Sequence, residues 1–405
     1  MPNVRKNAMR EILNPSVIIC DNEIYNETKE LFRNIKVFKI SEILNSSINE
    51  NILKIIRDRH ISTNPLYCNF TSGSTGGTPK GVLISHASVI DFIPIFCDTL
   101  GLKSSDIFAN QAPFDFDVSV KDIYSTLFLG ASCLLIPREY FTNANNLMDF
   151  IEDSTVLIWA VSALVFLSVM KALSYKKPNL RKIIYSGEIM PAKHIARLSS
   201  YLDNTEFINV YGPSEITCNA TYHTLSGDEF ENGLDIIGKA FANRLVFLID
   251  ENDKLIIEAN IVGQICVSGI CVGLGYLGGD NSVFCANELG QRYYKTGDLG
   301  YLDENNLLHF KGRKDHQIKR MGHRIELSEI EKMAHKLNGV EMVCAIYEND
   351  KLNVYYSGSD KTSELSEFLR ENLPFYMIPN KLIYLKNMPI NKNGKIDRNA
   401  LKEMK

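Results

Sequence analysis

Short apolar runs alternate with amphipathic stretches through the first half of the chain. A run of about four to eight apolar residues is typical of a buried strand, whereas apolar positions three or four apart form one face of a helix. The alternation predicts an α/β architecture with mainly parallel strands. Strands are expected at Val17–Cys20, Leu66–Phe70, Cys133–Ile136, Val156–Trp159, Lys182–Tyr185 and Phe207–Tyr211, and helices at Ser119–Phe128 and Ala192–Leu202.

The pattern changes near Leu245, where short strand-like runs are separated by turn-rich segments such as Asp250–Asp253 and Asp303–Asn306. This pattern predicts an antiparallel, barrel-like unit. Its strands are expected at Arg244–Asp250, Lys254–Glu258, Gly263–Ser268, Gly300–Leu302 and Leu307–Phe310.

A smaller unit is expected after Gly312, because helical and strand-like periods alternate again there. Two domains are therefore predicted, at residues 1–313 and 314–405. The smaller unit should contain helices at Glu326–Leu337 and Ser363–Leu373 and strands at Val340–Tyr347 and Lys351–Ser357.

The segment Thr155–Met170 is almost free of charge. It is shorter than the roughly 20 residues that a helix needs to cross a bilayer. A buried strand that continues into a buried helix is the better interpretation.

Composition and charge narrow the function classes. The chain has 405 residues, 45% of them hydrophobic and 23% charged, with a formal net charge of -4. Nothing supplies a broad cationic face, so neither a nucleic-acid partner nor a membrane partner is expected. The nine cysteines form no CxxC pair and no apolar run follows the first charges, which favours reduced thiols and a cytoplasmic location.

A glycine-rich stretch at residues 71–81 is the most informative motif. Its glycines let backbone N–H groups converge on an anion, its hydroxyls add donors, and its lysine adds a positive charge. Lys80 is followed by Gly81 rather than Ser or Thr, so this is not a P-loop. The predicted phosphate-binding residues are Thr71, Ser72, Gly73, Ser74, Thr75, Gly76, Thr78 and Lys80.

This loop resembles the phosphate-binding signature of the adenylate-forming superfamily, which includes acyl- and aryl-CoA synthetases, luciferases and the adenylation domains of peptide synthetases. The resemblance covers nearly the whole chain and is closest to amino-acid adenylation domains and D-alanine–carrier-protein ligases. It implies a large core of layered α/β sheets plus a distorted β-barrel, followed by a small mobile α+β lid. The other motifs, in family order, are Ser186–Glu188, Asn209–Glu215, Tyr294–Leu299, Gly312–Lys319, Gly322–Leu327 and Asn391–Arg398.

The resemblance implies ATP and Mg²⁺ as cofactors and assigns roles to individual residues. Tyr211 would stack on adenine, Asp298 would accept the ribose hydroxyls, and Glu215 would hold the metal. A carboxylate suits the last two tasks, as a double acceptor and as a hard oxygen ligand. The full AMP-binding set is Gly187, Glu188, Asn209, Tyr211, Gly212, Ser214, Asp298 and Arg313.

The resemblance also places a hinge at Asp315 and the catalytic lysine at Lys395. Lys395 would neutralise charge that develops on the α-phosphate when the substrate carboxylate attacks. The small domain would then rotate about Asp315, withdraw Lys395 and present the segment around Gly322 to the phosphopantetheine thiol of a carrier protein.

The stretch Ala112–Tyr124 resembles amino-acid adenylation domains, in which an aspartate pairs with the α-ammonium group of the substrate. Asp117 matches this aspartate, so the resemblance implies an amino-acid substrate. The alternative is that Asp117 caps the helix that begins near Val118. Lys121 could pair with an acidic or polar substrate side chain, or it could extend to solvent. Trp159 should make the pocket shallow. The expected pocket is lined by Asp117, Val118, Lys121, Trp159, Ile184, Ser186, Val210, Cys218 and Asn219.

The chain is expected to be short at its N-terminus, since family members usually extend further before the point where Pro2 and Arg5 lie. Either the sequence starts late, a separate chain supplies the segment, or the protein is degenerate. No carrier motif follows Lys395, so the carrier protein is expected to act in trans. The alternatives to amino-acid adenylation are an acyl- or aryl-CoA ligase and a truncated remnant that binds ATP without turnover.

Overall fold

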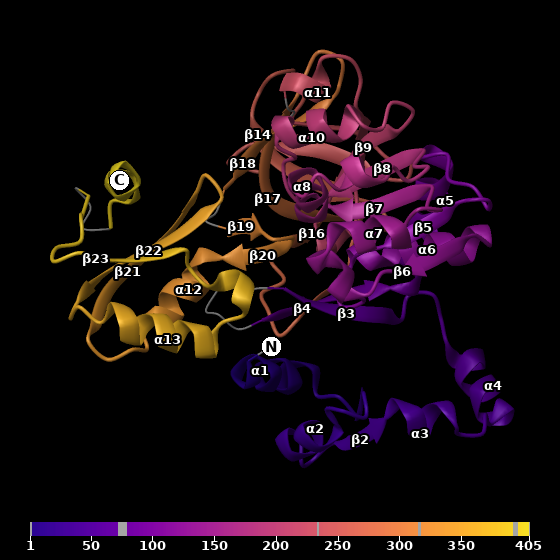
Figure 1. The fold of residues 1–405 in the computed structure, drawn as a ribbon, viewed down its shortest axis with the longest axis horizontal. Helices are drawn as coiled ribbons and strands as arrows, with labels where there is room; N and C mark the ends of the chain where they lie inside the picture. Colours follow the sequence, from indigo (N-terminus) through magenta and orange to yellow (C-terminus); the bar gives the residue numbers. More distant parts are fainter. Residues whose placement is uncertain (1, 72–78, 233–234, 315–316, 392–395, 405) are drawn as a thin grey trace.

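The computed structural model of the chain describes residues 2–71, 79–232, 235–314, 317–391 and 396–404 (Figure 1). Its centre is a 13-stranded sheet in which a parallel half and an antiparallel half are joined edge to edge. The parallel half has the order β6-β5-β7-β8-β9, which confirms the predicted α/β class. These strands are β5 (Ile107–Asn110), β6 (Ser132–Leu135), β7 (Val156–Ala160), β8 (Lys182–Ser186) and β9 (Glu206–Tyr211).

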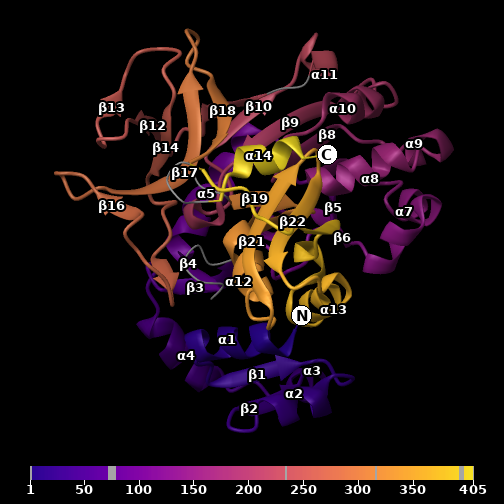
Figure 2. The ribbon, with the colours of Figure 1, turned by 90° about the vertical axis from the view of Figure 1, so that its left-hand side faces the viewer.

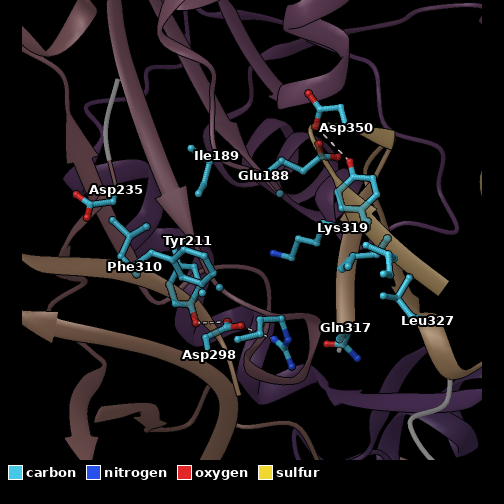
Figure 3. Close-up of a pocket in the computed structure, with 18 of the residues that line it drawn as sticks. Glu188, Ile189, Tyr211, Asp235, Asp298, Phe310, Gln317, Lys319, Leu327 and Asp350 are labelled. Atoms are coloured by element: carbon cyan, nitrogen blue, oxygen red, sulfur yellow. Dashed lines mark hydrogen bonds and ion pairs between the residues drawn. The ribbon is translucent and has the colours of Figure 1, made fainter. Parts of the chain in front are cut away.

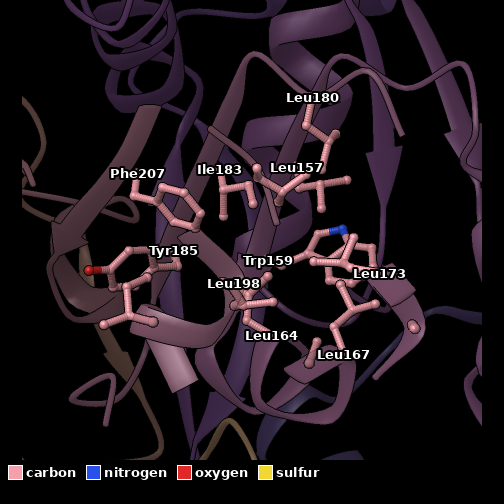
Figure 4. Packing of buried hydrophobic residues seen from close by; sticks show 14 of the residues in the cluster. Leu157, Trp159, Leu164, Leu167, Leu173, Leu180, Ile183, Tyr185, Leu198 and Phe207 are labelled. Carbon is pink, nitrogen blue, oxygen red and sulfur yellow. The ribbon is translucent and has the colours of Figure 1, made fainter. Parts of the chain in front are cut away.

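The central strands are buried on both faces because their side chains alternate between two apolar clusters. Leu157 and Trp159 belong to the cluster under α7, α8 and α10 (Figure 4), whereas Val156 and Ile158 belong to the cluster under α5 and α6. The helices of this region are α5 (His86–Thr99), α6 (Val118–Leu129), α7 (Ala144–Phe150), α8 (Val161–Val169), α9 (Ala172–Tyr175) and α10 (Ala192–Ser199), with a 3-10 turn at Arg138–Thr142.

The apolar stretch at residues 155–170 forms β7 and then α8, as expected. Within the part of the chain that the structure describes, no helix has the length and apolar character needed to cross a membrane.

The antiparallel half continues the same sheet beyond β9. Among the described residues its hydrogen-bonded order is open and ends at β13, so the expected distorted barrel is not confirmed. The strands are β10 (Thr221–Thr224), β11 (Ile236–Ala240), β12 (Leu245–Ile249), β13 (Leu255–Ile256), β14 (Gly263–Ser268), β16 (Phe284–Ala286), β17 (Arg292–Leu302) and β18 (Leu308–Arg313), and a short helix, α11, spans Glu229–Asn232.

A separate three-stranded sheet carries the glycine-rich loop. Strands β3 (Pro65–Thr71) and β4 (Lys80–Ser85) pair antiparallel, and β15 (Gly275–Leu277) pairs with β4. Thr71 lies opposite Lys80 in this hairpin. The two ends of the predicted phosphate loop are therefore held side by side.

The C-terminal elements form a unit with an apolar cluster of its own. Every buried member of this cluster, from Ile325 to Met377, lies beyond residue 313. The elements are β19 (Gln317–Arg320), β20 (His323–Glu326), α12 (Leu327–Ala334), β21 (Val340–Glu348), β22 (Lys351–Gly358), α13 (Thr362–Asn372), a 3-10 turn at Phe375–Met377, β23 (Lys381–Tyr384) and α14 (Arg398–Glu403).

The N-terminal segment lies below this unit in Figure 2 and packs loosely. Only Arg5 and Cys20 are buried among its described residues before Pro65, and it exposes apolar side chains such as Leu44 and Ile56. Arg5 forms a 2.8 Å ion pair with Glu329 of α12. The segment contains α1 (Asn3–Leu13), β1 (Val17–Cys20), α2 (Tyr25–Leu31), β2 (Lys36–Lys39), α3 (Ile40–Leu44) and α4 (Glu50–Arg59).

Candidate functional site

A cavity of about 580 Å³ lies between the sheet and the C-terminal unit (Figure 3). Its size is within the usual range for small-molecule sites. Aromatic residues Tyr211 and Phe310 and the polar residues Glu188, Asp298 and Lys319 line it. All of the predicted AMP-binding residues except Ser214 contribute to its wall: Gly187, Glu188, Asn209, Tyr211, Gly212, Asp298 and Arg313.

Strand pairing positions the carboxylate of Asp298 in this cavity. The alternation along β17 turns Asp298 to the same buried side as Thr296, and Arg313 of β18 lies directly opposite it. Arg313 forms an ion pair with Asp298 Oδ1, and the Tyr211 hydroxyl donates to Asp298 Oδ2 at 2.5 Å. Burial raises the pKa of Tyr211, and the adjacent Asp298 raises it further, so the hydroxyl stays protonated as a donor.

The turn after β9 depends on Gly212. A Cβ at this position would lie 2.6 Å from the Cys218 carbonyl oxygen and 2.7 Å from Asn219 Cα. No side chain fits there, so glycine allows the backbone of residues 218–219 to pack against the turn. This close approach brings Cys218 and Asn219 beside the motif that carries Tyr211.

A second cavity of about 120 Å³ adjoins the first. The two cavities share a wall made of Gly187, Gly212, Asp298, Arg313 and Lys319. Most of the predicted substrate-pocket residues line the smaller cavity, as do Thr71 and Ser214. These pocket residues are Asp117, Val118, Lys121, Ser186, Cys218 and Asn219.

Asp117 occupies the position before the first residue of α6. Its side chain makes no capping hydrogen bond, so the alternative that Asp117 serves as a helix cap is wrong. The Cys218 thiol donates to the Asp117 carbonyl oxygen at 3.2 Å. Asp117 thus lines the smaller cavity, and its side chain makes no capping hydrogen bond to α6.

Lys121 is enclosed, with 1% of its surface exposed, so the alternative that it extends to solvent is wrong. Its Nζ donates to Asn219 Oδ1 at 3.1 Å and to Ser186 Oγ at 3.3 Å. Burial lowers the pKa of Lys121, while Cys218, Asp117 and Asp122 oppose the shift.

Three predicted pocket residues lie elsewhere. Trp159 is fully buried in the cluster of Figure 4 and donates from Nε1 to the Ala109 carbonyl oxygen at 2.8 Å. Ile184 points into the cluster on the opposite face of the sheet, and Val210 lines the larger cavity. Among the described lining residues, neither Trp159 nor Ile184 faces either cavity, so the expectation that Trp159 sets the pocket depth is not supported.

Glu215, the expected metal ligand, is buried and already engaged. Arg324 Nη1 donates to its two oxygens at 2.8 and 2.9 Å, and the Tyr276 hydroxyl donates to Oε1 at 2.5 Å. Burial would raise the pKa of Glu215, but the Arg324 charge and the Tyr276 hydrogen bond outweigh it and lower the pKa below its ordinary value. Glu215 is therefore held as a carboxylate.

The glycine-rich loop is described only at its ends. Lys80 Nζ lies 4.8 Å from the centre of the Tyr276 ring, and burial lowers its pKa. The predicted loop residues Ser72, Gly73, Ser74, Thr75, Gly76 and Thr78, the hinge Asp315 and the catalytic lysine Lys395 lie outside the described residues.

The C-terminal unit contacts the core through two neighbouring residues, Gly322, which has a predicted role, and His323, which has none. The Gly322 N–H donates to Glu188 Oε1 at 2.7 Å. The His323 ring stacks on Tyr376 with ring centres 3.6 Å apart and meets Phe116 of the core edge-on at 4.9 Å. Both Gly322 and His323 belong to the motif at residues 322–327. The sequence alone, however, does not show which residues of the core this motif contacts.

Comparison with known proteins shows which family this chain resembles. Residues 15–277 match the family described as AMP-binding enzyme. Bacitracin synthase 1 of Bacillus licheniformis is 35% identical over 352 residues, which are 83% of this chain and 7% of that protein. A D-alanine--D-alanyl carrier protein ligase of Bacillus cereus (strain G9842) is 32% identical over 353 residues, 83% of this chain and 70% of that protein.

Solved structures share the fold. An adenylation domain of Vibrio cholerae in complex with glycyl-adenosine-5'-phosphate superposes with a TM-score of 0.84 at 20% identity, covering 99% of this chain and 82% of that chain. A protein containing adenylation and PCP domains superposes with a TM-score of 0.81 at 23% identity, covering 99% and 69%. At these identities the likeness shows the fold alone.

Proposed function

Because the chain belongs to the AMP-binding enzyme family, we propose that it activates an amino acid with ATP and transfers it to the phosphopantetheine thiol of a separate carrier protein. In the first step a carboxylate oxygen of the substrate attacks the α-phosphorus of ATP, and the bond to pyrophosphate breaks. In the second step the thiolate sulfur attacks the acyl carbon and the bond to the phosphate oxygen breaks. AMP leaves, and the thiol proton passes to solvent.

The observation that carries this proposal is the shared wall of the two cavities. AMP in the larger cavity and an amino acid in the smaller one would meet at this wall, beside Arg313 and Lys319. Holding two reactants in contact in this way converts a bimolecular reaction into an effectively unimolecular one. Asp298, positioned by Tyr211 and Arg313, is assigned to the ribose hydroxyls, and Asp117 to the substrate ammonium group.

We assign residues 1–313 to the adenylation core and residues 314–405 to a lid that turns about Asp315. In the first step Lys395 would neutralise the charge that develops at the α-phosphate. The docking of Gly322 on Glu188 and of His323 on Phe116 is compatible with the arrangement for the second step. Such a lid also protects a hydrolysable adenylate from water.

Magnesium bound at Glu215 would neutralise phosphate charge. Proteins often hold Mg²⁺ with one or two carboxylates plus substrate phosphates, so a single glutamate is compatible with this role. Among the described residues no group of three His, Cys, Asp or Glu residues could hold a metal without such phosphates. Both oxygens of Glu215 now accept from Arg324, so Glu215 fits the metal only in a lid position from which Arg324 has withdrawn.

The carrier-protein partner is supported by the likeness to a D-alanine--D-alanyl carrier protein ligase and to a solved protein that contains adenylation and PCP domains. The amino-acid substrate is supported by Asp117, which lines the smaller cavity and whose side chain does not cap α6.

ATP–pyrophosphate exchange with a panel of acids tests the proposal. The panel contains both stereoisomers of the amino acids, including D-alanine, together with fatty acids and aryl acids. Exchange with an amino acid is the expected result, followed by loading of that amino acid onto a phosphopantetheinylated carrier protein. Exchange with fatty or aryl acids only would identify a CoA ligase. ATP binding without exchange for any acid would identify a binding remnant.

A further inference from the structure

The smaller cavity contains an enclosed cation, Lys121, whose hydrogen-bond acceptors are both neutral. Asn219 Oδ1 and Ser186 Oγ accept from its Nζ, and no carboxylate of the described residues forms an ion pair with it. Removing an ammonium group from water is costly unless a counter-ion compensates it. Burial accordingly lowers the pKa of Lys121, and a ligand carboxylate placed at its Nζ would favour the charged form again.

Two carboxylates near Lys121, those of Asp122 and Asp117, could compensate its charge, but neither does so once the substrate is bound. Asp122 accepts from Asn110 Nδ2 at 3.2 Å, its Oδ1 has no described partner, and burial raises the pKa of Asp122 to about 7. Asp117 balances Lys121 only while the cavity is empty. Once the substrate ammonium group occupies Asp117, neither carboxylate compensates a positive charge on Lys121.

On the basis of the proposed function, we propose that Lys121 makes this site selective for an α-amino acid with an acidic side chain. The α-ammonium group pairs with Asp117, the side-chain carboxylate pairs with Lys121, and the α-carboxylate is left to react. Two ion pairs then form in the cavity and no buried charge stays uncompensated. A neutral side chain in the same place leaves Lys121 unpaired.

The length of the substrate side chain is limited by the size of the cavity. Asp117 and Lys121 are four residues apart at the start of α6, so they lie on one helix face about one turn, roughly 5–6 Å, apart. A ligand that contacts both must reach from Asp117 to the place where Lys121 Nζ meets Ser186 and Asn219. The small cavity of about 120 Å³ leaves room only for a short side chain. Aspartate and glutamate are the amino acids with short acidic side chains.

The experiment compares aspartate and glutamate with asparagine and glutamine in ATP–pyrophosphate exchange. The amides have nearly the same shape but no charge, so the ratio of kcat/KM isolates the contribution of Lys121. The intact protein is expected to favour one of the acids over its amide by about tenfold or more, since a hydrogen bond to a charged group contributes on the order of 1.5–3 kcal/mol. Calorimetric binding of the same amino acids without ATP should give the same order.

The variants Lys121→Gln and Lys121→Arg complete the test, with Lys103→Gln as a control at an exposed lysine of the same domain. Lys121→Gln should lose the preference for the acid by raising its KM, whereas Lys121→Arg should keep it. Thermal unfolding shows whether each variant is folded.

The inference on Lys121 is overturned if the intact protein activates a neutral amino acid and not the acids, or if Lys121→Gln leaves the ratio unchanged. In both cases amino-acid adenylation itself would stand. If no amino acid supports exchange, the proposed function fails, and the inference fails with it.

Discussion

Arg324 of β20 donates hydrogen bonds from Nη1 to both carboxylate oxygens of Glu215, at 2.8 and 2.9 Å. The two residues are 109 positions apart and belong to different units of the fold. The contact joins the C-terminal unit to the carboxylate that is proposed to hold magnesium. A metal ion and Arg324 therefore compete for the same ligand.

Arg324→Ala should impair thioester formation more than adenylation. The substitution removes a charge-assisted contact that contributes about 1.5–3 kcal/mol to docking, which corresponds to a roughly tenfold to hundredfold slower loading of the carrier protein. ATP–pyrophosphate exchange should be retained, because it uses a lid position without this contact. Arg370→Ala, at an exposed arginine of the same unit, is the control. Equal losses in the two assays would contradict the assignment.

Asp117→Ala should abolish amino-acid-dependent pyrophosphate exchange. Removing one partner of a buried charge pair costs about 2–5 kcal/mol, so kcat/KM should fall by roughly thirtyfold or more. The matched control is Asp115→Ala, since Asp115 lies at the same cavity but is exposed. Unchanged exchange in the Asp117 variant would remove the amino-acid assignment.

Lys395→Ala should slow adenylation by about 10²–10³-fold, the effect usually seen when one group that stabilises transition-state charge is removed. Transfer from a pre-formed aminoacyl-adenylate to the carrier thiol should change little. Lys392→Ala, in the same sequence motif, serves as the control. A fully retained adenylation rate would exclude the proposed lid mechanism.

Docking of the C-terminal unit should weaken in acid because of His323. Burial lowers the pKa of His323 to about 4, with Asp115 opposing the shift and Arg5 adding to it. The undocked histidine, with an ordinary pKa near 6.5, binds a proton first as the pH falls. The docked state is thus fully favoured above about pH 6.5 and loses stability between about pH 6.5 and 4.

Fluorescence energy transfer between dyes on the two units can follow this change. In His323→Phe, which retains a ring for Tyr376 and Phe116, the dependence on pH in this window should disappear. If the variant shows the same acid response as the intact protein, another group is responsible.

Many strands and helices were predicted from sequence because each follows from a local pattern. The strand at Val17–Cys20 and the strand at Gly263–Ser268 have the observed bounds, and β7 continues into α8 as expected. Strands β4 and β5 were not predicted, and the strand expected at Gly300–Leu302 begins already at Arg292. Residues such as Gly297 and Asp298 weaken the apolar alternation, and pairing with β14, β16 and β18 keeps this strand extended.

The order of motifs along the chain by itself determined the family resemblance, and all of the predicted AMP-binding and pocket residues except Trp159 and Ile184 line one of the two cavities. The direction in which those residues point was decided by the tertiary structure. Trp159 and Ile184 turn away from the cavities because each strand face is committed to an apolar cluster. Lys121 forms hydrogen bonds with Ser186 and Asn219, and Glu215 forms them with Arg324. The partners in these bonds are 65 to 109 positions apart in the sequence. Burial and charge pairing at such distances depend on how separate elements pack, and no local pattern in a sequence encodes that.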